Sequence, residues 1–199
     1  MGLKLDRSRI IGRGSSRRCF QHPFEKSRCV KVEKRDYFLK ITREEIKYYK
    51  LFQKRGISWD MLARFHGIVK TDLGEGAVFD MPHDYDGEIS RTLDYYLDAQ
   101  SIPAGELGRA LRAFKDYMMQ ERIVVRELKA DNLVYQRNSS SLGKIVLIDG
   151  LGNNEFFPFA NYSRLFAWRM LQKKWLKFKG SILKDYPGNA LTKDLISLL

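Results

Sequence analysis

The stretch VRELKADN, residues 125–132, places acidic, basic and amide side chains close together, after a helical pattern and before the apolar residues LVY. Its Glu127 carboxylate can orient a hydroxyl group and accept its proton, because glutamate has an unperturbed pKa of about 4.3 and is ionised at neutral pH. Two interpretations are open at this point. The stretch is either a charged surface loop or a loop that holds phosphate and a metal ion.

A second candidate pair is Lys31 and Glu45. Lys31 lies between apolar residues in CVKV, and Glu45 lies on the apolar face of the next helical pattern, together with Ile41, Tyr48, Tyr49 and Phe52. A carboxylate on such a face normally acquires a cation or a hydrogen-bond partner, because burying it without one is costly. We therefore predict a Lys31–Glu45 ion pair. The alternative is that Glu45 completes a capping box with Thr42.

The glycine-rich stretch IGRGSS contains Gly12 and Gly14 and lies between two predicted strands. A dinucleotide-binding βαβ unit needs such a loop between a strand and a helix, so this class of site is not expected here. The stretch is either a simple turn or a flexible hairpin whose backbone can approach phosphate groups.

The elements that must position these residues are mainly strands at first and helices later. The segments RIIG, RCFQ and RCVKVE predict an antiparallel meander, GIVKT and GAVFD predict a strand pair, and NLVYQ and KIVLID predict a later hairpin. Helical patterns cover residues 42–55, 105–121 and about 161–179, with a short helix at the end. This order predicts an α+β fold with two unequal lobes.

Composition fits one globular domain with an anionic partner. The 199 residues are 44% hydrophobic and carry a formal net charge of +12. The N-terminus MGLKLDRSR lacks the apolar core of a signal peptide, and the two cysteines, Cys19 and Cys29, fit a reducing compartment. We expect a cytoplasmic protein.

The segment NYSRLFAWRMLQKKWLKFKG combines aromatic and basic residues in a helical pattern. One interpretation is a core-packing helix with a solvated basic face. The other is a contact with an acidic partner or an anionic membrane surface, since basic amphipathic helices with Trp and Phe bind anionic lipid. The second interpretation would place the protein peripherally at the inner membrane.

In order along the chain, GRGSSR, Lys31, Glu45, VRELKADN and Asp149 in LIDGLG resemble the signature set of protein kinases, over about residues 9–155. The segments CFQHP, CVKV, EIKYY, RFHG, RIV and LKADNL resemble more closely the bacterial YrbL family of PhoP regulatory network proteins, a kinase-like group. The resemblance implies a minimal two-lobed kinase-like domain over residues 1–199. Its small β-rich N-lobe would cover about residues 1–82, and a truncated helical C-lobe about 83–199.

For the nucleotide, the resemblance implies that Gly12 and Gly14 let their loop cover the phosphates of ATP. Lys31, held by Glu45, would contact the α and β phosphates. The segment FDMPHD, residues 79–84, would be the hinge beneath adenine.

For phosphoryl transfer, the resemblance implies that Asn132 and Asp149 hold magnesium through oxygen ligands. Glu127 occupies the position of the catalytic aspartate, and Lys129 would steady the transferred phosphoryl group. These four residues and the nucleotide contacts would form one active site.

The sequence departs from the kinase pattern at several positions. Glu127 stands where kinases carry aspartate, Val125 where they carry histidine, and Arg17 at the third glycine position of the loop. The extra methylene of Glu127 displaces the carboxylate by more than an ångström, and such a shift costs on the order of a hundredfold in rate. No Ala-Pro-Glu motif follows DGLG, so a usual protein substrate is not expected.

We therefore expect a phosphotransferase that uses ATP and Mg to phosphorylate a hydroxyl of a small molecule, lipid or glycan. One alternative is a nucleotide-binding pseudokinase that acts as a regulatory module and binds a regulatory protein. A third hypothesis is a basic nucleic-acid-binding protein, but the chain contains no recognised motif for nucleic acid, and we do not expect that partner.

Overall fold

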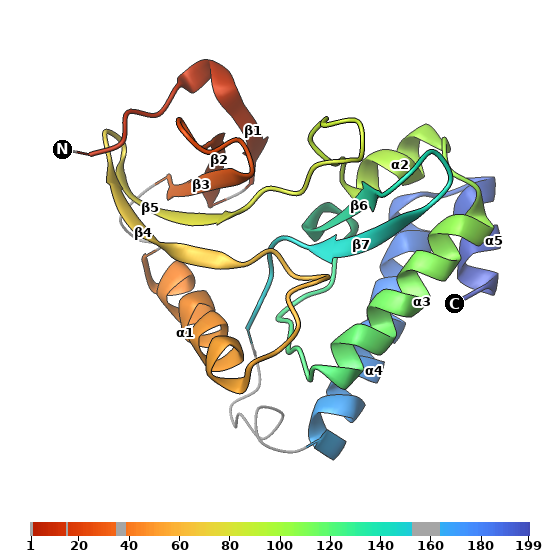
Figure 1. Ribbon diagram of the computed structural model, residues 1–199. Helices are drawn as coiled ribbons and strands as arrows, with labels where there is room; N and C mark the ends of the chain where they lie inside the picture. The colour runs from red at the N-terminus through yellow and green to blue at the C-terminus, as the bar shows by residue number, and fades with distance from the viewer. Residues whose placement is uncertain (1, 15, 35–38, 153–163) are drawn as a thin grey trace. The chain divides into compact units, whose positions relative to one another are not determined.

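The computed structural model describes residues 2–14, 16–34, 39–152 and 164–199 (Figure 1). The chain divides into two compact units. The first comprises Met1–Gly56 and Ala63–Pro82, and the second comprises Ile57–Leu62 and His83–Leu199. The segment Ile57–Leu62 therefore groups with the second unit, although it precedes the last strands of the first in the chain.

The first unit contains a five-stranded sheet in the order β1-β2-β3-β5-β4, in which neighbouring strands are antiparallel. Its elements are the 3₁₀ turn η1 (Arg7–Arg9), β1 (Ile10–Arg13), β2 (Arg17–Gln21), β3 (Arg28–Glu33), helix α1 (Leu39–Arg55), β4 (Phe65–Thr71) and β5 (Gly74–Asp80). The predicted antiparallel meander and the later strand pair are confirmed. Together with the helices, this sheet confirms an α+β fold.

The two faces of the sheet are covered differently. Val30 and Val32 on β3 are buried with Leu5, Phe20 and Val78 in a core on one face. Side chains alternate along a strand, so Lys31 points to the opposite face.

Helix α1 lies against this opposite face (Figure 1). Its Tyr49 ring packs at 5.9 Å from that of Phe65 on β4 and at 5.3 Å from that of Phe79 on β5. Aromatic pairs at these separations stabilise more than their buried area alone. They fix α1 over the side of the sheet that carries Lys31.

The start of α1 corrects one prediction. The helix begins at Leu39, so Thr42 lies inside it and is not its N-cap. The Thr42 hydroxyl donates a hydrogen bond to the Glu33 carboxylate on β3 instead. The proposed capping box with Glu45 is therefore wrong, because a helix has no free backbone N–H groups to cap at that position.

The second unit combines a two-stranded hairpin with most of the helices. Its elements are α2 (Leu93–Ala99), α3 (Ala104–Gln120), the 3₁₀ turn η3 (Ala130–Asn132), β6 (Leu133–Arg137), β7 (Gly143–Leu147), α4 (Arg164–Asp185) and α5 (Ala190–Ser197). The predicted hairpin and the predicted helix near 105–121 are confirmed. Leu62 forms a parallel bridge with Leu147, which places the segment Ile57–Leu62 beside β7.

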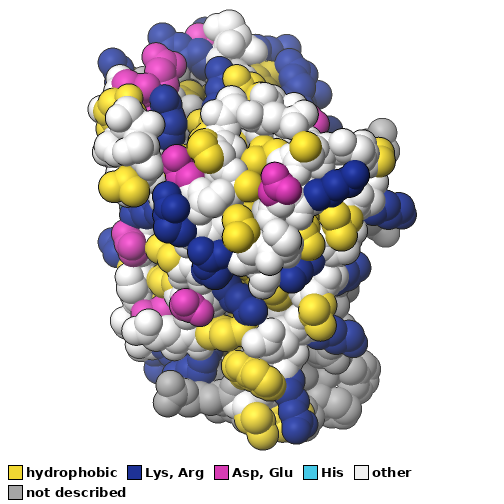
Figure 2. All heavy atoms as spheres, turned by 90° about the vertical axis from the view of Figure 1, so that its right-hand side faces the viewer, with side chains coloured by type: hydrophobic (Ala, Val, Ile, Leu, Met, Phe, Trp, Pro, Cys, Tyr) yellow, Lys and Arg dark blue, Asp and Glu magenta, His cyan; other side chains and the backbone are white. Residues whose placement is uncertain are grey.

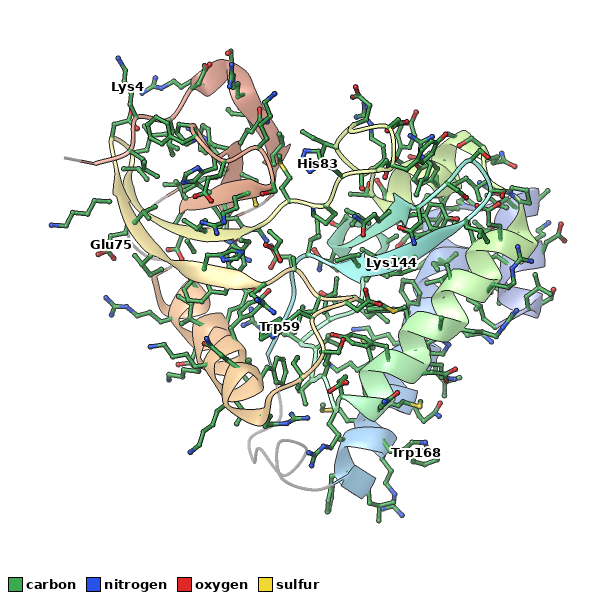
Figure 3. All side chains as sticks on the ribbon, in the orientation of Figure 1. Lys4, Trp59, Glu75, His83, Lys144 and Trp168 are labelled. Atoms are coloured by element: carbon green, nitrogen blue, oxygen red, sulfur yellow. The ribbon has the colours of Figure 1, made fainter. Side chains whose placement is uncertain are left out.

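Helix α4 extends beyond the predicted end of the basic, aromatic helix and reaches Asp185, whereas the predicted residues 161–163 lie outside the described residues. Trp175 and Phe178 are buried in the core, while Leu165, Trp168 and Leu176 are exposed. Trp168, labelled in Figure 3, extends outward from the first turns of the helix. Among the described residues, no helix combines the length and hydrophobicity needed to cross a bilayer.

Candidate functional site

The predicted site residues form two groups, one in each unit. Gly12, Gly14, Lys31 and Glu45 belong to the first unit. Glu127, Lys129, Asn132 and Asp149 belong to the second. Each group is held by its own local structure.

In the first unit, strand register places a row of residues across one face of the sheet. Gly12 on β1 lies opposite Cys19 on β2, which lies opposite Lys31 on β3, and Lys31 lies opposite Ala77 on β5. Directly opposed residues share a face, so the row lies on the side covered by α1. In this row, only the small side chain of Cys19 therefore lies between Gly12 of the glycine loop and Lys31, the lysine predicted to contact the nucleotide.

Lys31 is buried, and its Nζ lies 4.7 Å from the centre of the Phe79 ring. A desolvated ammonium over an aromatic face is attracted by the ring quadrupole. Glu45 is also buried, at 2% exposure, and lies on α1 on the same side of the sheet. The structure thus brings both residues to one face, and their ion pair stays a prediction.

Arg17 is a residue whose role the sequence did not reveal. Its Nη1 donates to Glu45 Oε2 at 2.6 Å, and both side chains are buried. Arg17 lies opposite Glu33, two residues along β3 from Lys31, so the two cations share the face toward α1. Arg17, which stands at the third glycine position of the kinase loop pattern, therefore supplies a partner for Glu45.

The loop that contains Gly14 is also tied to β3. Lys34, which follows the end of β3, donates from Nζ to the Gly14 carbonyl at 2.5 Å. The backbone N–H of Lys34 donates to the Ser16 carbonyl at 2.9 Å. These bonds hold the glycine loop close to the strand that carries Lys31.

In the second unit, the stretch VRELKADN is paired with the stretch that follows β7. Val125 and Leu151 form an antiparallel bridge, and the Arg126 N–H donates to the Gly150 carbonyl at 2.8 Å. The Ile148 N–H donates to the Asn132 carbonyl at 2.9 Å. VRELKADN is therefore not a free surface loop, because its backbone is fixed against the segment that carries Asp149.

Gly150 permits this close approach. It has a φ of +88°, and a Cβ built there would lie 2.9 Å from the Glu127 carbonyl oxygen and 3.0 Å from Asn132 Nδ2. Both the dihedral and the space require glycine. The Asn132 side chain consequently lies against the residue that follows Asp149, and the Asp149 carboxylate accepts from the Gly150 N–H at 2.7 Å.

The carboxyl group of Asp131, next to Asn132 in the chain, is partly desolvated. Desolvation raises the pKa of the Asp131 carboxyl, Lys129 opposes the rise, and the charges of Asp94 and Asp149 add to it. Within the described part of the chain, no three His, Cys, Asp or Glu side chains are grouped to hold a metal. The amide oxygen of Asn132 and the carboxylate of Asp149 are hard ligands that fit Mg²⁺ when the remaining ligands come from phosphate and water.

Glu127 lies between lysines from two elements. Its Oε2 is 3.2 Å from Lys129 Nζ, and its Oε1 is 3.9 Å from Lys177 Nζ on α4. One helical turn before Lys177, Lys174 donates from Nζ to the Arg126 carbonyl. Sequence patterns did not predict that α4 contacts this loop, because the two segments are far apart in the chain.

Comparison with known proteins identifies the family. A family model described as "PhoP regulatory network protein YrbL" matches residues 3–182. The chain is 32% identical over 197 residues to the "Uncharacterized protein YrbL" of Escherichia coli (strain K12), a match that covers 97% of this chain and 92% of that protein. The protein of the same name in Shigella flexneri matches equally. The family resemblance seen in the sequence is thereby confirmed.

Proposed function

The chain belongs to the family of the PhoP regulatory network protein YrbL, and on this premise we propose that it is a small kinase-like phosphotransferase that uses ATP and Mg²⁺. The proposed acceptor is a hydroxyl group of a small molecule, a lipid or a glycan. The observation that supports the proposal is the close fit at Gly150, the residue after Asp149, where a built Cβ would lie 2.9 Å from the Glu127 carbonyl oxygen and 3.0 Å from Asn132 Nδ2.

The first unit supports nucleotide binding. Gly12 and Gly14 would allow their loop to cover the phosphates, and Lys31 would contact them from the strand opposite. Glu45 would orient Lys31 and is itself anchored by Arg17 at 2.6 Å. Lys31 must give up part of its contact with water to lie over Phe79, so a phosphate oxygen is a favourable partner for its charge.

The second unit supports the transfer step. When bound, Mg²⁺ would neutralise charge on the phosphates, with Asn132 and Asp149 as its protein ligands. Glu127 would orient the acceptor hydroxyl and take its proton, and Lys129 would stabilise negative charge on the transferred group. The Glu127 side chain is partly exposed, so an acceptor can reach it from solvent.

The transfer step is tested by following ADP formation with pools of candidate acceptors. We expect Glu127→Gln to abolish turnover while nucleotide affinity stays within about twofold, since the amide cannot accept the proton. Lys31→Met should weaken ATP binding, and Lys26→Met is its matched control, because Lys26 is an exposed lysine of the same unit. Lys34 is a poor control, because it contacts the glycine loop. Equal ATP affinities in Lys31→Met and Lys26→Met would show that Lys31 does not contact the nucleotide.

A second candidate function is a nucleotide-binding regulatory module without transfer activity. This function is favoured by the contacts of Glu127, because each oxygen of its carboxylate is already paired with a lysine ammonium group. The family description, which refers to a regulatory network, points the same way. The two functions separate cleanly: a module binds ATP and Mg²⁺ but forms no more ADP than its Glu127→Gln variant.

A further inference from the structure

Helix α4 contributes basic side chains to the surroundings of Glu127. Lys174 is half-buried and is fixed by its bond to the Arg126 carbonyl. Lys177 lies three residues later, on the same side of the helix, with 75% of its side chain exposed. Lys174 thus anchors the helix, while Lys177 remains available to a ligand from solvent.

The ion pairs at Glu127 are of a kind that exchanges easily. Lys129 and Lys177 approach opposite oxygens of the carboxylate, and their side chains are 52% and 75% exposed. Exposed pairs of this type contribute about 0–1 kcal/mol, because water competes for both charges. An arriving anion with several oxygens can therefore replace the Glu127 carboxylate as the partner of both lysines.

Several basic side chains lie near Glu127 in the part of the chain that the structure describes. The Arg126 guanidinium lies beside Gly152, with Nη2 at 3.2 Å from the position of a built Cβ. Lys177 is the more exposed of the two lysines, at 75% against 52% for Lys129. Figure 2 shows Lys and Arg side chains among hydrophobic ones, with a few acidic side chains between them, on the face that it presents. Such clustering concentrates anions locally.

We infer that Lys177 binds an anionic group, a phosphate or a carboxylate, that the phosphoryl acceptor carries in addition to its hydroxyl, while Lys129 is shared between this group and the transferred phosphoryl group. The inference rests on the proposed function and narrows its acceptor to anionic alcohols. Ammonium groups recognise phosphate as point charges, so no fixed fork geometry is required. Binding of the anion would draw both lysines away from Glu127 and free its carboxylate for the acceptor hydroxyl.

In the proposed transfer, the bond between the γ phosphorus of ATP and its bridging oxygen breaks, and ADP leaves with that electron pair. A new bond forms between this phosphorus and the acceptor oxygen, whose proton passes to the Glu127 carboxylate. The products are ADP and a phosphomonoester of the anionic alcohol.

Inorganic phosphate is the probe, titrated into the nucleotide-free protein at constant ionic strength with chloride as the reference anion. We expect saturable binding that weakens about tenfold or more in Lys129→Gln/Lys177→Gln, which loses two charge-assisted contacts. The matched control is Lys184→Gln/Lys193→Gln, which removes two exposed lysines from α4 and α5 of the same unit. Its affinity should stay within about twofold. Equal weakening in both double variants, or the absence of saturable binding, overturns the site.

Glu127→Gln gives a sharper check, because the carboxylate competes with phosphate for the lysines. This variant should bind phosphate several-fold more tightly than wild type, whereas weaker binding contradicts the exchange of partners. Vesicles of phosphatidylglycerol and of phosphatidylcholine distinguish the sources of the anion. Binding to the former that depends on Lys129 and Lys177 identifies a lipid headgroup, and a response to free phosphate alone identifies a soluble acceptor.

Titration of ADP with Mg²⁺ in the same variants separates this inference from the proposed function. Phosphate binding that depends on Lys129 and Lys177, in a protein that binds no nucleotide, leaves the anion site standing and removes the phosphotransferase. Nucleotide binding together with equal phosphate affinity in both double variants removes the anion site and leaves the phosphotransferase standing.

Discussion

Replacing Arg17 by Met should strongly destabilise the first unit. The change leaves the Glu45 carboxylate, which is 2% exposed, without the guanidinium that donates to it at 2.6 Å. Removing one partner of a buried ion pair costs roughly 3–5 kcal/mol, because the other charge stays desolvated. Lys31 lies on the same face of the sheet and can take over part of the interaction, so we expect a value near the lower end.

A loss of about 3 kcal/mol corresponds to a decrease in Tm of roughly 6–12 °C for a chain of this size. Urea unfolding of Arg17→Met, Glu45→Met and the double variant gives the coupling energy directly. We expect the double variant to be no less stable than either single variant, since paired apolar side chains replace a paired charge. Arg18→Met is the control, because Arg18 is the next residue of β2 and is exposed; its stability should change by less than about 0.5 kcal/mol.

Additive losses in the two single variants would refute this reasoning. Additivity within about 0.5 kcal/mol means that the two side chains do not interact. A loss in Arg18→Met equal to that in Arg17→Met would also contradict it. The effect would then come from strand propensity or net charge and not from the pair.

The other predictions concern the second unit. Gly150→Ala should cost roughly 1–3 kcal/mol, because it forces a strained φ and pushes a methyl group toward Asn132; thermal unfolding measures the loss, and full stability would refute the fit. The pKa of Asp131 is raised in the folded protein, so its charge destabilises the fold as pH rises above about 3.8. Asp131→Asn should therefore raise Tm at pH 7 and leave Tm unchanged well below pH 3.8, where the carboxyl is protonated in both the folded and the unfolded state. A variant that is less stable than wild type at pH 7 would contradict the raised pKa. Trp168→Ala should weaken binding to phosphatidylglycerol vesicles in co-sedimentation, whereas Phe24→Ala, which removes an exposed aromatic residue of the other unit, should not.

Sequence patterns predicted most of the elements of the fold because those elements are specified locally. The alternation in RCVKVE marks β3, and the spacing of apolar residues marks α3, where Leu107, Leu111, Phe114 and Met118 are all buried. The predicted start of α1 at Thr42 was wrong, because the spacing of Thr42 and Glu45 matches a capping box equally well when both residues lie inside a helix. Only tertiary structure shows that Thr42 bonds Glu33 on β3.

The contacts at the candidate site were harder to predict than its residues. Arg17 reaches Glu45 only because β2 and β3 pair in a register that turns Arg17 toward α1. Lys174 and Lys177 contact residues about fifty positions earlier, and a helical pattern gives no sign of which loop the helix packs against. The residue types at Glu127, Asn132 and Asp149 were visible in the sequence, whereas the partners that set their charge environment depend on long-range packing.

The most direct test of the proposed phosphotransferase is nucleotide binding by calorimetry, with ATP titrated in the presence of Mg²⁺ and again with EDTA. Wild type should bind ATP more tightly with Mg²⁺, and Asp149→Ala should lose this difference because it lacks one of the two proposed protein ligands. Asp98→Asn, which changes an exposed carboxylate of the same unit, should keep the difference. The same Mg²⁺ dependence in Asp149→Ala as in wild type, or no ATP binding by wild type, would contradict the proposed function.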